Sequence, residues 1–224
     1  MTKQNLTSIN IVLDRSGSMT KLTAETITGF NKFLNEQKAV DGEATLTLAT
    51  FASDYTLVHD FLPLKSVDEL TLTTYKTGGY TALLDALVKT IDATGAKLAA
   101  LPEEERPGKV IFVVITDGQE NFSKTFTKTH AMEKITHQRE KYGWEFVWMG
   151  CDMSQVADGI SLGVSVSNAV MYSGTSEGVA SAYQSISSNT ATYRSGTAQQ
   201  VNFFDQGSAV VPDVKIDVDV KVSK

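Results

Sequence analysis

The chain has 224 residues, of which 42% are hydrophobic and 21% charged, and its formal net charge is −6 at pH 7. This composition is typical of a soluble globular protein and predicts one domain that buries a core without disulfide bonds. Cys151 is the only cysteine, so no disulfide can form within the chain. The acidic balance and the lack of a dense lysine and arginine cluster argue against nucleic acid as a partner.

The first ten residues, MTKQNLTSIN, lack the basic segment and apolar run that mark a secretory signal. No stretch reaches the roughly 18 consecutive apolar residues that a membrane helix requires. A single thiol is also typical of a reducing compartment. We therefore expect a cytoplasmic protein with no membrane partner.

Three short apolar runs, at residues 9–13, 110–115 and 144–149, predict strands of a parallel sheet, because longer amphipathic stretches separate them. The middle run has no polar residue, so we expect it to be buried on both faces, with helices covering both sides of the sheet. Two further strands are predicted at 44–51 and 55–61. The short Ser53-Asp54 step between them predicts a hairpin and one antiparallel edge strand.

Apolar residues at helical spacing predict helices at 20–37, 82–100, 127–142 and 176–192. A short helix at 152–159 and a last short strand at 169–172 complete the pattern. The alternation of strands and helices predicts an α/β fold: a doubly wound, Rossmann-like, mostly parallel sheet with one antiparallel edge strand and helices on both faces.

The sequence changes character near residue 195, where a polar segment rich in Ser, Gly and Gln begins. We therefore divide the chain into a domain at 1–194 and a C-terminal extension at 195–224. Residues 214–222 alternate apolar and charged side chains, which predicts a half-buried strand. That strand could fold back on its own domain or add to a sheet edge of another chain, including a second copy.

Oxygen-bearing side chains cluster where two predicted strands end. The first strand runs into Asp14-Arg15-Ser16-Gly17-Ser18, and the long apolar strand runs into Thr116-Asp117-Gly118. Open α/β sheets place their ligand sites at this carboxyl edge. Between these segments, Gly78-Gly79-Tyr80-Thr81 supplies a further hydroxyl just before a helix.

Together the three loops offer five hard oxygen donors, namely Asp14, Ser16, Ser18, Thr81 and Asp117. Such donors suit Mg²⁺ rather than zinc or copper, and Mn²⁺ or Ca²⁺ accept the same oxygens. We expect the glycines of these loops to let them turn tightly and close around the ion; they are Gly17, Gly78, Gly79 and Gly118. Because Mg²⁺ takes six oxygens, at least one position remains for a carboxylate of a partner.

These three segments resemble the metal ion-dependent adhesion site of von Willebrand factor type A domains, and the resemblance covers residues 6–194. It implies a doubly wound α/β fold and metal-mediated binding of an acidic side chain of a protein partner. The same five residues would be direct or water-bridged ligands. It also implies an intracellular bacterial or viral setting, and in the family the metal loops can be coupled to a shift of the last helix, here 176–192.

Two other functions remain as alternatives. The first is a structural or assembly component that acts through the strand at 214–222. The second, less favoured, is a Mg²⁺-dependent hydrolase, but neither nucleotide-binding glycine motif is present and the only nearby extra acids are Asp85 and Glu120. We therefore expect a protein that is not an enzyme.

Several other polar and aromatic groups are expected to be structural. His130, Glu133 and His137 fall at i, i+3 and i+7 of a predicted helix, where we expect a solvated face rather than a metal site. The aromatic residues of the strand at 144–149 are expected to pack in the core. We also expect a structural role for His59 and a buried position for Cys151.

Overall fold

The computed structural model describes residues 1–196, and the strand predicted at 214–222 lies outside them. The sheet has six strands in the order β3-β2-β1-β4-β5-β6. All neighbouring strands pair in parallel except β3, which pairs antiparallel with β2 at one edge. The predicted α/β architecture is confirmed, including the antiparallel edge strand.

The strands β2, β5 and β6 agree with the predicted ranges to within one residue, whereas β1, β3 and β4 extend further than predicted. The first strand begins six residues before its apolar run, because the polar residues after Lys3 still pair along their backbones with both neighbouring strands. The bounds are β1 (Lys3–Asp14), β2 (Glu43–Phe51), β3 (Tyr55–Pro63), β4 (Pro107–Thr116), β5 (Glu145–Gly150) and β6 (Ala169–Met171).

Five α-helices occur at the predicted places, and the main difference is at the start of the first. Residues Gly17–Leu22 form a 3-10 helix, so the α-helix begins at Thr23 rather than at residue 20. No helix within residues 1–196 is long and apolar enough to cross a membrane. The bounds are α1 (Thr23–Ala39), α2 (Leu83–Ala100), α3 (Lys128–Tyr142), α4 (Met153–Ser161) and α5 (Ser176–Ser195).

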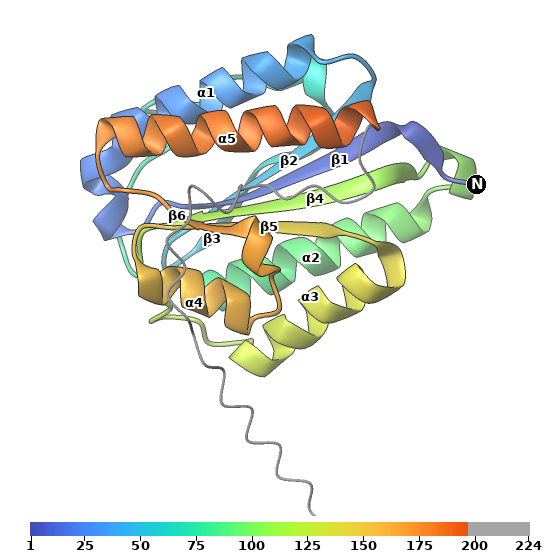
Figure 1. The fold of residues 1–224 in the computed structure, drawn as a ribbon. Coiled ribbons are helices and arrows are strands. Elements are labelled where there is room, and N and C mark those ends of the chain that lie inside the picture. Colours follow the sequence, from blue (N-terminus) through green and yellow to red (C-terminus); the bar gives the residue numbers. More distant parts are fainter. Residues whose placement is uncertain (197–224) are drawn as a thin grey trace, which may run out of the picture.

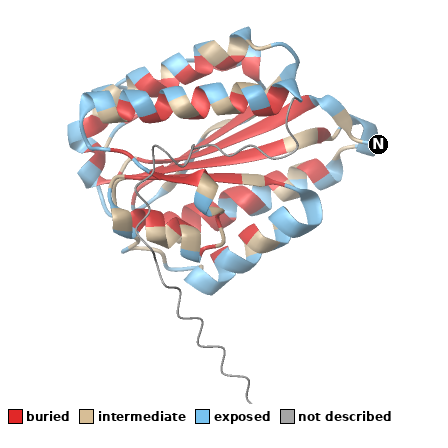
Figure 2. Cartoon of the chain, viewed as in Figure 1, coloured by how far each residue is buried: buried red, intermediate tan, exposed pale blue. Residues whose placement is uncertain are grey.

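The helices cover both faces of the sheet, as the apolar middle strand predicts. Helices α1 and α5 lie side by side on one face, and α2, α3 and α4 lie on the other (Figure 1). Alternate residues of β4 enter the two cores: Ile111 and Val113 face α1 and α5, whereas Phe112 and Val114 face the other layer. Buried residues accordingly line the strands and the inner sides of the helices (Figure 2).

The aromatic residues of the strand predicted at 144–149 pack in the core, as expected. Phe112 stacks against Trp144 with ring centroids 5.4 Å apart and against Phe146 at 5.2 Å. Trp148 is fully buried in the same cluster. These side chains fill the space between the sheet and the layer that contains α2 and α3.

A buried arginine joins the end of α5 to the end of α1. One terminal nitrogen of Arg194 donates to the backbone oxygen of Gln37 at 2.5 Å and to its side-chain oxygen at 3.2 Å. The other donates to the backbone oxygens of Val40 at 3.4 Å and Gly42 at 3.3 Å. The two helices also pack closely, because Gly29 of α1 lies directly against the ring of Tyr183. This arginine therefore donates to carbonyl groups at and just after the end of α1, of which that of Gln37 is buried.

We predict that Arg194→Gln lowers the free energy of unfolding by about 2–3 kcal/mol, because it leaves the backbone and side-chain oxygens of the buried Gln37 without their charged donor. Urea denaturation of the two proteins measures this difference. Lys32→Gln on the exposed side of α1 removes the same charge and is expected to change stability by less than about 0.5 kcal/mol. Equal, small effects of the two substitutions would contradict this role of Arg194.

Candidate metal centre

The parallel pairing of β1 with β4 brings Asp14 beside Thr116. The register aligns Leu13 with Ile115, so the next residues of the two strands leave the sheet at the same edge. Asp14 is fully buried. Its Oδ1 accepts the backbone N–H of Ser16 at 2.7 Å, and its Oδ2 accepts the hydroxyl of Thr116 at 2.7 Å. The carboxylate is therefore held in one orientation.

Hydroxyl groups connect the loop after β1 to the loop after β4. The Oγ atoms of Ser16 and Ser18 lie 3.1 Å apart, and the Ser18 hydroxyl donates to Oδ1 of Asp117. The other oxygen of this carboxylate, Oδ2, is buried and accepts no hydrogen bond from any residue in the described part of the chain. A buried carboxylate oxygen without a donor is costly, and a cation would compensate it.

Thr81 brings a third loop to the same place. An ideal Cβ on Gly118 would lie 2.9 Å from Thr81 Oγ1, 3.3 Å from Ser18 Oγ and 3.5 Å from Asp14 Oδ2. Three side-chain oxygens therefore converge on one point, and Gly118 leaves that point free of a side chain. The site opens to solvent through a shallow depression of about 400 Å³ that Tyr80 and Asp152 also line.

Backbone hydrogen bonds hold the three loops together. The N–H of Gly17 donates to the carbonyl of Gly79 at 3.0 Å, and the N–H of Gly78 donates to the carbonyl of Arg15 at 2.8 Å. Across the site, the N–H of Thr81 donates to Oδ1 of Asn121 at 2.9 Å. The loops are thus fixed relative to one another by contacts that do not use the five candidate ligand groups.

The glycines serve this geometry in different ways. Gly78 and Gly79 have φ angles of 148° and 83°, which side chains disfavour, so this loop uses the conformational freedom of glycine. Gly118 supplies space rather than an unusual backbone angle. Gly17 differs from the expectation, since its φ is outside the left-handed region and a Cβ there would meet only Gly79 O, at 3.4 Å. The turn at Gly17 therefore does not depend on glycine conformation.

Burial raises the pKa of both carboxyl groups. For Asp14 the loss of solvation outweighs the hydrogen bonds from Thr116 and Ser16, which lower its pKa. For Asp117 burial outweighs the Ser18 hydroxyl and the positive charge of Lys21. Both carboxylates are thus held in a place that disfavours negative charge, as expected for groups arranged around a cation.

The structure adds residues that the sequence alone did not single out. Tyr75 donates its hydroxyl to the backbone oxygen of Asp14 at 2.6 Å, and Tyr172 donates to that of Thr116 at 3.3 Å. Thr116 could have been inferred from the pairing of the two strand ends. Tyr75 lies in an irregular segment far along the chain, so no local pattern indicates its contact.

Asp85 and Glu120, the two nearby acids that a hydrolase could use, already accept hydrogen bonds from the backbone. Glu120 accepts backbone N–H groups of Leu84 at 2.9 Å and Phe122 at 2.8 Å. Asp85 accepts three backbone N–H groups, from Lys124, Thr125 and Phe126. Both carboxylates therefore fix the loop after β4.

The other polar residues considered as possible ligands have positions that fit a structural role. His130 caps its own helix by accepting the N–H of Thr127 at 3.2 Å. Its helix face is exposed, and within residues 1–196 no group of three His, Cys, Asp or Glu side chains could hold a metal. His59 is half-buried on β3, and burial lowers its pKa. Cys151 is partly buried against the core that α1 and α5 cover, rather than fully buried as expected.

Solved structures with the same architecture allow the fold to be named. Proximal thread matrix protein 1 from the mussel byssus matches with a TM-score of 0.58 and 14% identity, over 84% of this chain and 47% of its own. A von Willebrand factor type A structure from Catenulispora acidiphila matches with a TM-score of 0.54 and 12% identity, over 84% and 43%. The chain has the von Willebrand factor type A fold.

One further structure of the mussel protein is described as having a zinc-occupied MIDAS motif, the metal ion-dependent adhesion site. It matches with a TM-score of 0.57 and 17% identity, over 83% of this chain and 46% of its own. The chain spans just under half the length of these solved proteins. No family model matches the sequence, and no curated protein matches it.

We predict that Asp117→Asn raises the free energy of unfolding in chelator by up to about 1 kcal/mol, because it removes a charge from a buried oxygen that lacks a donor. Thermal or urea unfolding in EDTA measures the change. Asp41→Asn, at an exposed position, serves as the control and is expected to have little effect. A clear loss of stability in Asp117→Asn would show that the carboxylate stabilises the metal-free fold.

Proposed function

We propose that this chain is a metal-dependent protein-binding module. A divalent cation would be held by Asp14, Ser16, Ser18, Thr81 and Asp117, and an acidic side chain of a protein partner would complete its coordination. The observation that carries the proposal is the convergence of oxygens of Thr81, Ser18 and Asp14 beside Gly118, near a buried Asp117 oxygen without a donor among the described residues. We further propose a cytoplasmic location, on the single thiol and the composition.

The donor set favours a small hard cation. Asp14 and Asp117 supply two negative charges, and the three hydroxyl groups supply neutral oxygens, which is the chemistry that Mg²⁺ accepts. Mn²⁺ and Ca²⁺ accept the same donors, and the zinc in the mussel protein's MIDAS motif makes Zn²⁺ part of the metal screen. A bound cation would supply an electrophilic centre for an anionic oxygen in a partly desolvated site.

The depression at the site is open enough for a protein side chain. Ser18 and Tyr80 are exposed at its rim, whereas Asp14, Ser16 and Thr81 are buried beneath. The protein thus keeps its charged groups below the surface and presents the coordination position to a partner. A carboxylate arriving there would replace water and neutralise the remaining charge.

We propose binding rather than catalysis. The nearby acids Asp85 and Glu120 accept backbone N–H groups and are therefore not placed to activate water. Metal-dependent hydrolysis of phosphate or peptide substrates that Asp14→Ala abolishes would overturn this assignment. The assembly alternative depends on residues 214–222, which lie outside the described residues.

We predict that Mg²⁺ or Mn²⁺ raises the melting temperature of the wild-type chain and that Gly118→Ala removes most of this increase. The added Cβ would stand 2.9 Å from Thr81 Oγ1, inside the point on which the oxygens converge. Differential scanning fluorimetry and isothermal titration calorimetry, each with and without EDTA, measure the effect.

Gly95→Ala provides the matched control, because a Cβ at Gly95 has no neighbour closer than 3.8 Å among the described residues. It should stabilise α2 by about 0.5–1 kcal/mol and leave the metal response unchanged. If metal raises the melting temperatures of Gly118→Ala and wild type equally, the metal binds elsewhere. If it raises neither, the chain binds no metal.

We predict that a protein partner is captured only by the metal-loaded wild type. Wild type and Asp117→Asn are each used as bait in host lysate with Mg²⁺ and with EDTA, after circular dichroism has verified that both are folded. Replacing each Asp and Glu of the captured partner by Asn and Gln should reveal one side chain whose loss lowers affinity as much as EDTA does. The same proteins captured in all four conditions would mean that the metal site takes no part in binding.

A further inference from the structure

An exposed tyrosine lies at the rim of the metal site. Tyr80 lines the depression together with Asp117, and its side chain is 63% exposed. Its neighbour in the chain, Thr81, is buried, with its hydroxyl oxygen at the place beside Gly118 on which the candidate ligands converge. The tyrosine is therefore one residue away from a candidate metal ligand, and a partner bound to the ion would lie beside it.

The ring of Tyr80 rests on a second aromatic ring. Tyr80 and Phe122 stack with their ring centroids 5.1 Å apart and their planes at 12° to each other. Phe122 is partly buried, whereas Tyr80 is exposed. Since the stacking covers only one face of the Tyr80 ring, its other face is open to solvent. These two residues thus form a small apolar surface at the rim, which we call the aromatic platform.

Hydrogen bonds fix the aromatic platform before any partner arrives. The N–H groups of Asn121 and Phe122 both donate to the carbonyl of Thr81, at 3.0 and 3.2 Å. The N–H of Thr81 donates to Oδ1 of Asn121 at 2.9 Å, and the N–H of Tyr80 donates to the hydroxyl oxygen of Ser53 at 2.9 Å. The two loops that carry the rings are therefore joined. A surface that is already ordered loses little entropy on binding, so it suits a docking role.

Three exposed lysines lie in the loops that form the metal site. They are Lys21, three residues after Ser18, Lys76, two residues before Gly78, and Lys124, in the loop after β4. None of the three has an ion pair within residues 1–196. The whole chain has a net charge of −6, so this positive charge is a local feature. It attracts an acidic partner and repels a basic one.

The exposed acid that lines the same depression lies on the other side of the metal site. Asp152 follows β5, whereas the N–H of Tyr80 is bonded to Ser53 in the loop after β2, and β1 and β4 lie between these strands. Asp152 also caps α4, because its Oδ1 accepts the N–H of Gln155 at 3.0 Å and the hydroxyl of Ser154 at 2.7 Å. An acidic partner therefore meets less repulsion beside the aromatic platform than beside α4.

We propose that the partner of the metal site is an acidic peptide segment in which an aromatic side chain lies close to the metal-binding carboxylate. The carboxylate binds the ion, the aromatic ring packs on the open face of Tyr80, and further acidic side chains face the three lysines. Both a ring and an arginine stack on tyrosine, but the lysines repel a second cation, so the ring is favoured. The inference rests on the proposed function, since it names the class of partner that the metal site would bind.

Peptide display tests this preference without a known partner. Random peptides of about twelve residues are selected on the full chain with Mg²⁺, and peptides that are also retained in EDTA are discarded. We expect the remaining peptides to be acidic and to carry Phe, Tyr or Trp within about three positions of an Asp or Glu. Selected peptides that lack an aromatic residue, or that have a net positive charge, would overturn the inference.

Variants of exposed tyrosines separate the aromatic platform from the metal. A selected peptide is titrated in Mg²⁺ and followed by fluorescence anisotropy. Tyr80→Ala should weaken its binding about tenfold, whereas Tyr80→Phe keeps the ring and should bind as wild type does. Tyr142→Ala removes an exposed ring at the end of α3 and should also bind as wild type does. The affinity for Mn²⁺ without peptide should be the same in all four proteins.

A matched pair of lysine variants tests the charge. Lys76→Gln should weaken binding of the acidic peptide about two- to threefold and reduce its dependence on salt. Lys65→Gln is the control, because Lys65 is exposed just after β3, at the opposite edge of the sheet. Equal effects of the two substitutions would contradict the role of the lysines.

Failure of this inference is distinguishable from failure of the proposed function. Equal peptide affinity of folded Tyr80→Ala and wild type would overturn the inference and leave metal-dependent binding intact. A selection that yields no metal-dependent peptide also overturns it. The change of melting temperature with metal then still tests the metal site by itself.

Discussion

The parallel pairing of β1 with β4 is the constraint on which the site depends. It places Asp14 and Thr116 at adjacent strand ends, in the most buried part of the sheet, and directs Asp117 into the following loop. Two carboxylates are thereby brought into a poorly solvated place, which raises the pKa of each. The hydroxyl groups of Thr116 and Ser18 partly compensate for that arrangement by donating to the two carboxylates.

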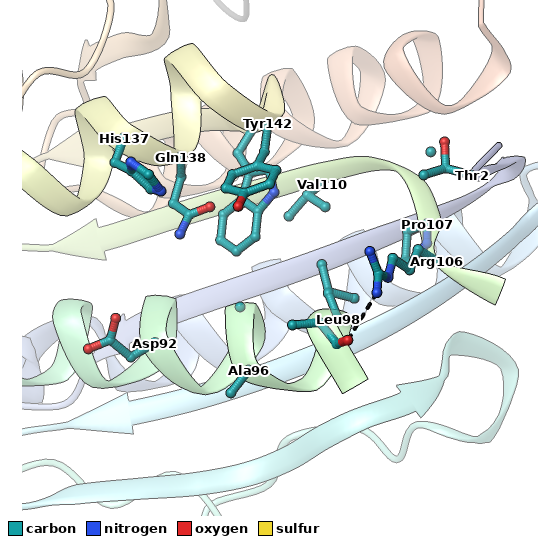
Figure 3. Close-up of a pocket in the computed structure, with 14 residues that line it drawn as sticks. Thr2, Asp92, Ala96, Leu98, Arg106, Pro107, Val110, His137, Gln138 and Tyr142 are labelled. Carbon is teal, nitrogen blue, oxygen red and sulfur yellow. Dashed lines mark hydrogen bonds between the residues drawn. The ribbon is translucent and has the colours of Figure 1, made fainter. Parts of the chain in front are cut away.

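The two ends of the sheet carry different chemistry. At the carboxyl ends of the strands, hard oxygens from three loops converge on one accessible point. At the amino end of β4, a cavity of about 440 Å³ lies between α2 and α3, with Arg106, Gln138 and Tyr142 in its lining (Figure 3).

The hydrogen bonds of Arg194 at the end of α5 bear on whether this helix can move. A shift of that helix, such as the family resemblance implies, would break the four hydrogen bonds from Arg194 to the segment that ends α1. The close packing of Tyr183 against Gly29 adds a steric fit between the two helices. Any movement of α5 must therefore offset the loss of these contacts.

Sequence patterns predicted the strands, the helices and the five candidate donors because each depends on local periodicity or on the residue that follows a strand. They did not predict the 3-10 turn at Gly17–Leu22 or the early start of β1, which depend on pairing between backbones rather than on side-chain pattern. Tyr75 and Arg194 were missed for a related reason. Their partners are distant in sequence, so only the folded chain brings them together.

The most direct test of the metal centre is a Mn²⁺ titration followed by the relaxation rate of water protons. The account predicts one tight site per chain, enhanced relaxation from an exchangeable coordination position, and a fall in that enhancement when acetate is added. Asp14→Ala should remove the tight site. An absence of tight Mn²⁺ binding to the wild type, or a bound ion whose effect on water does not change with carboxylate, would contradict the account.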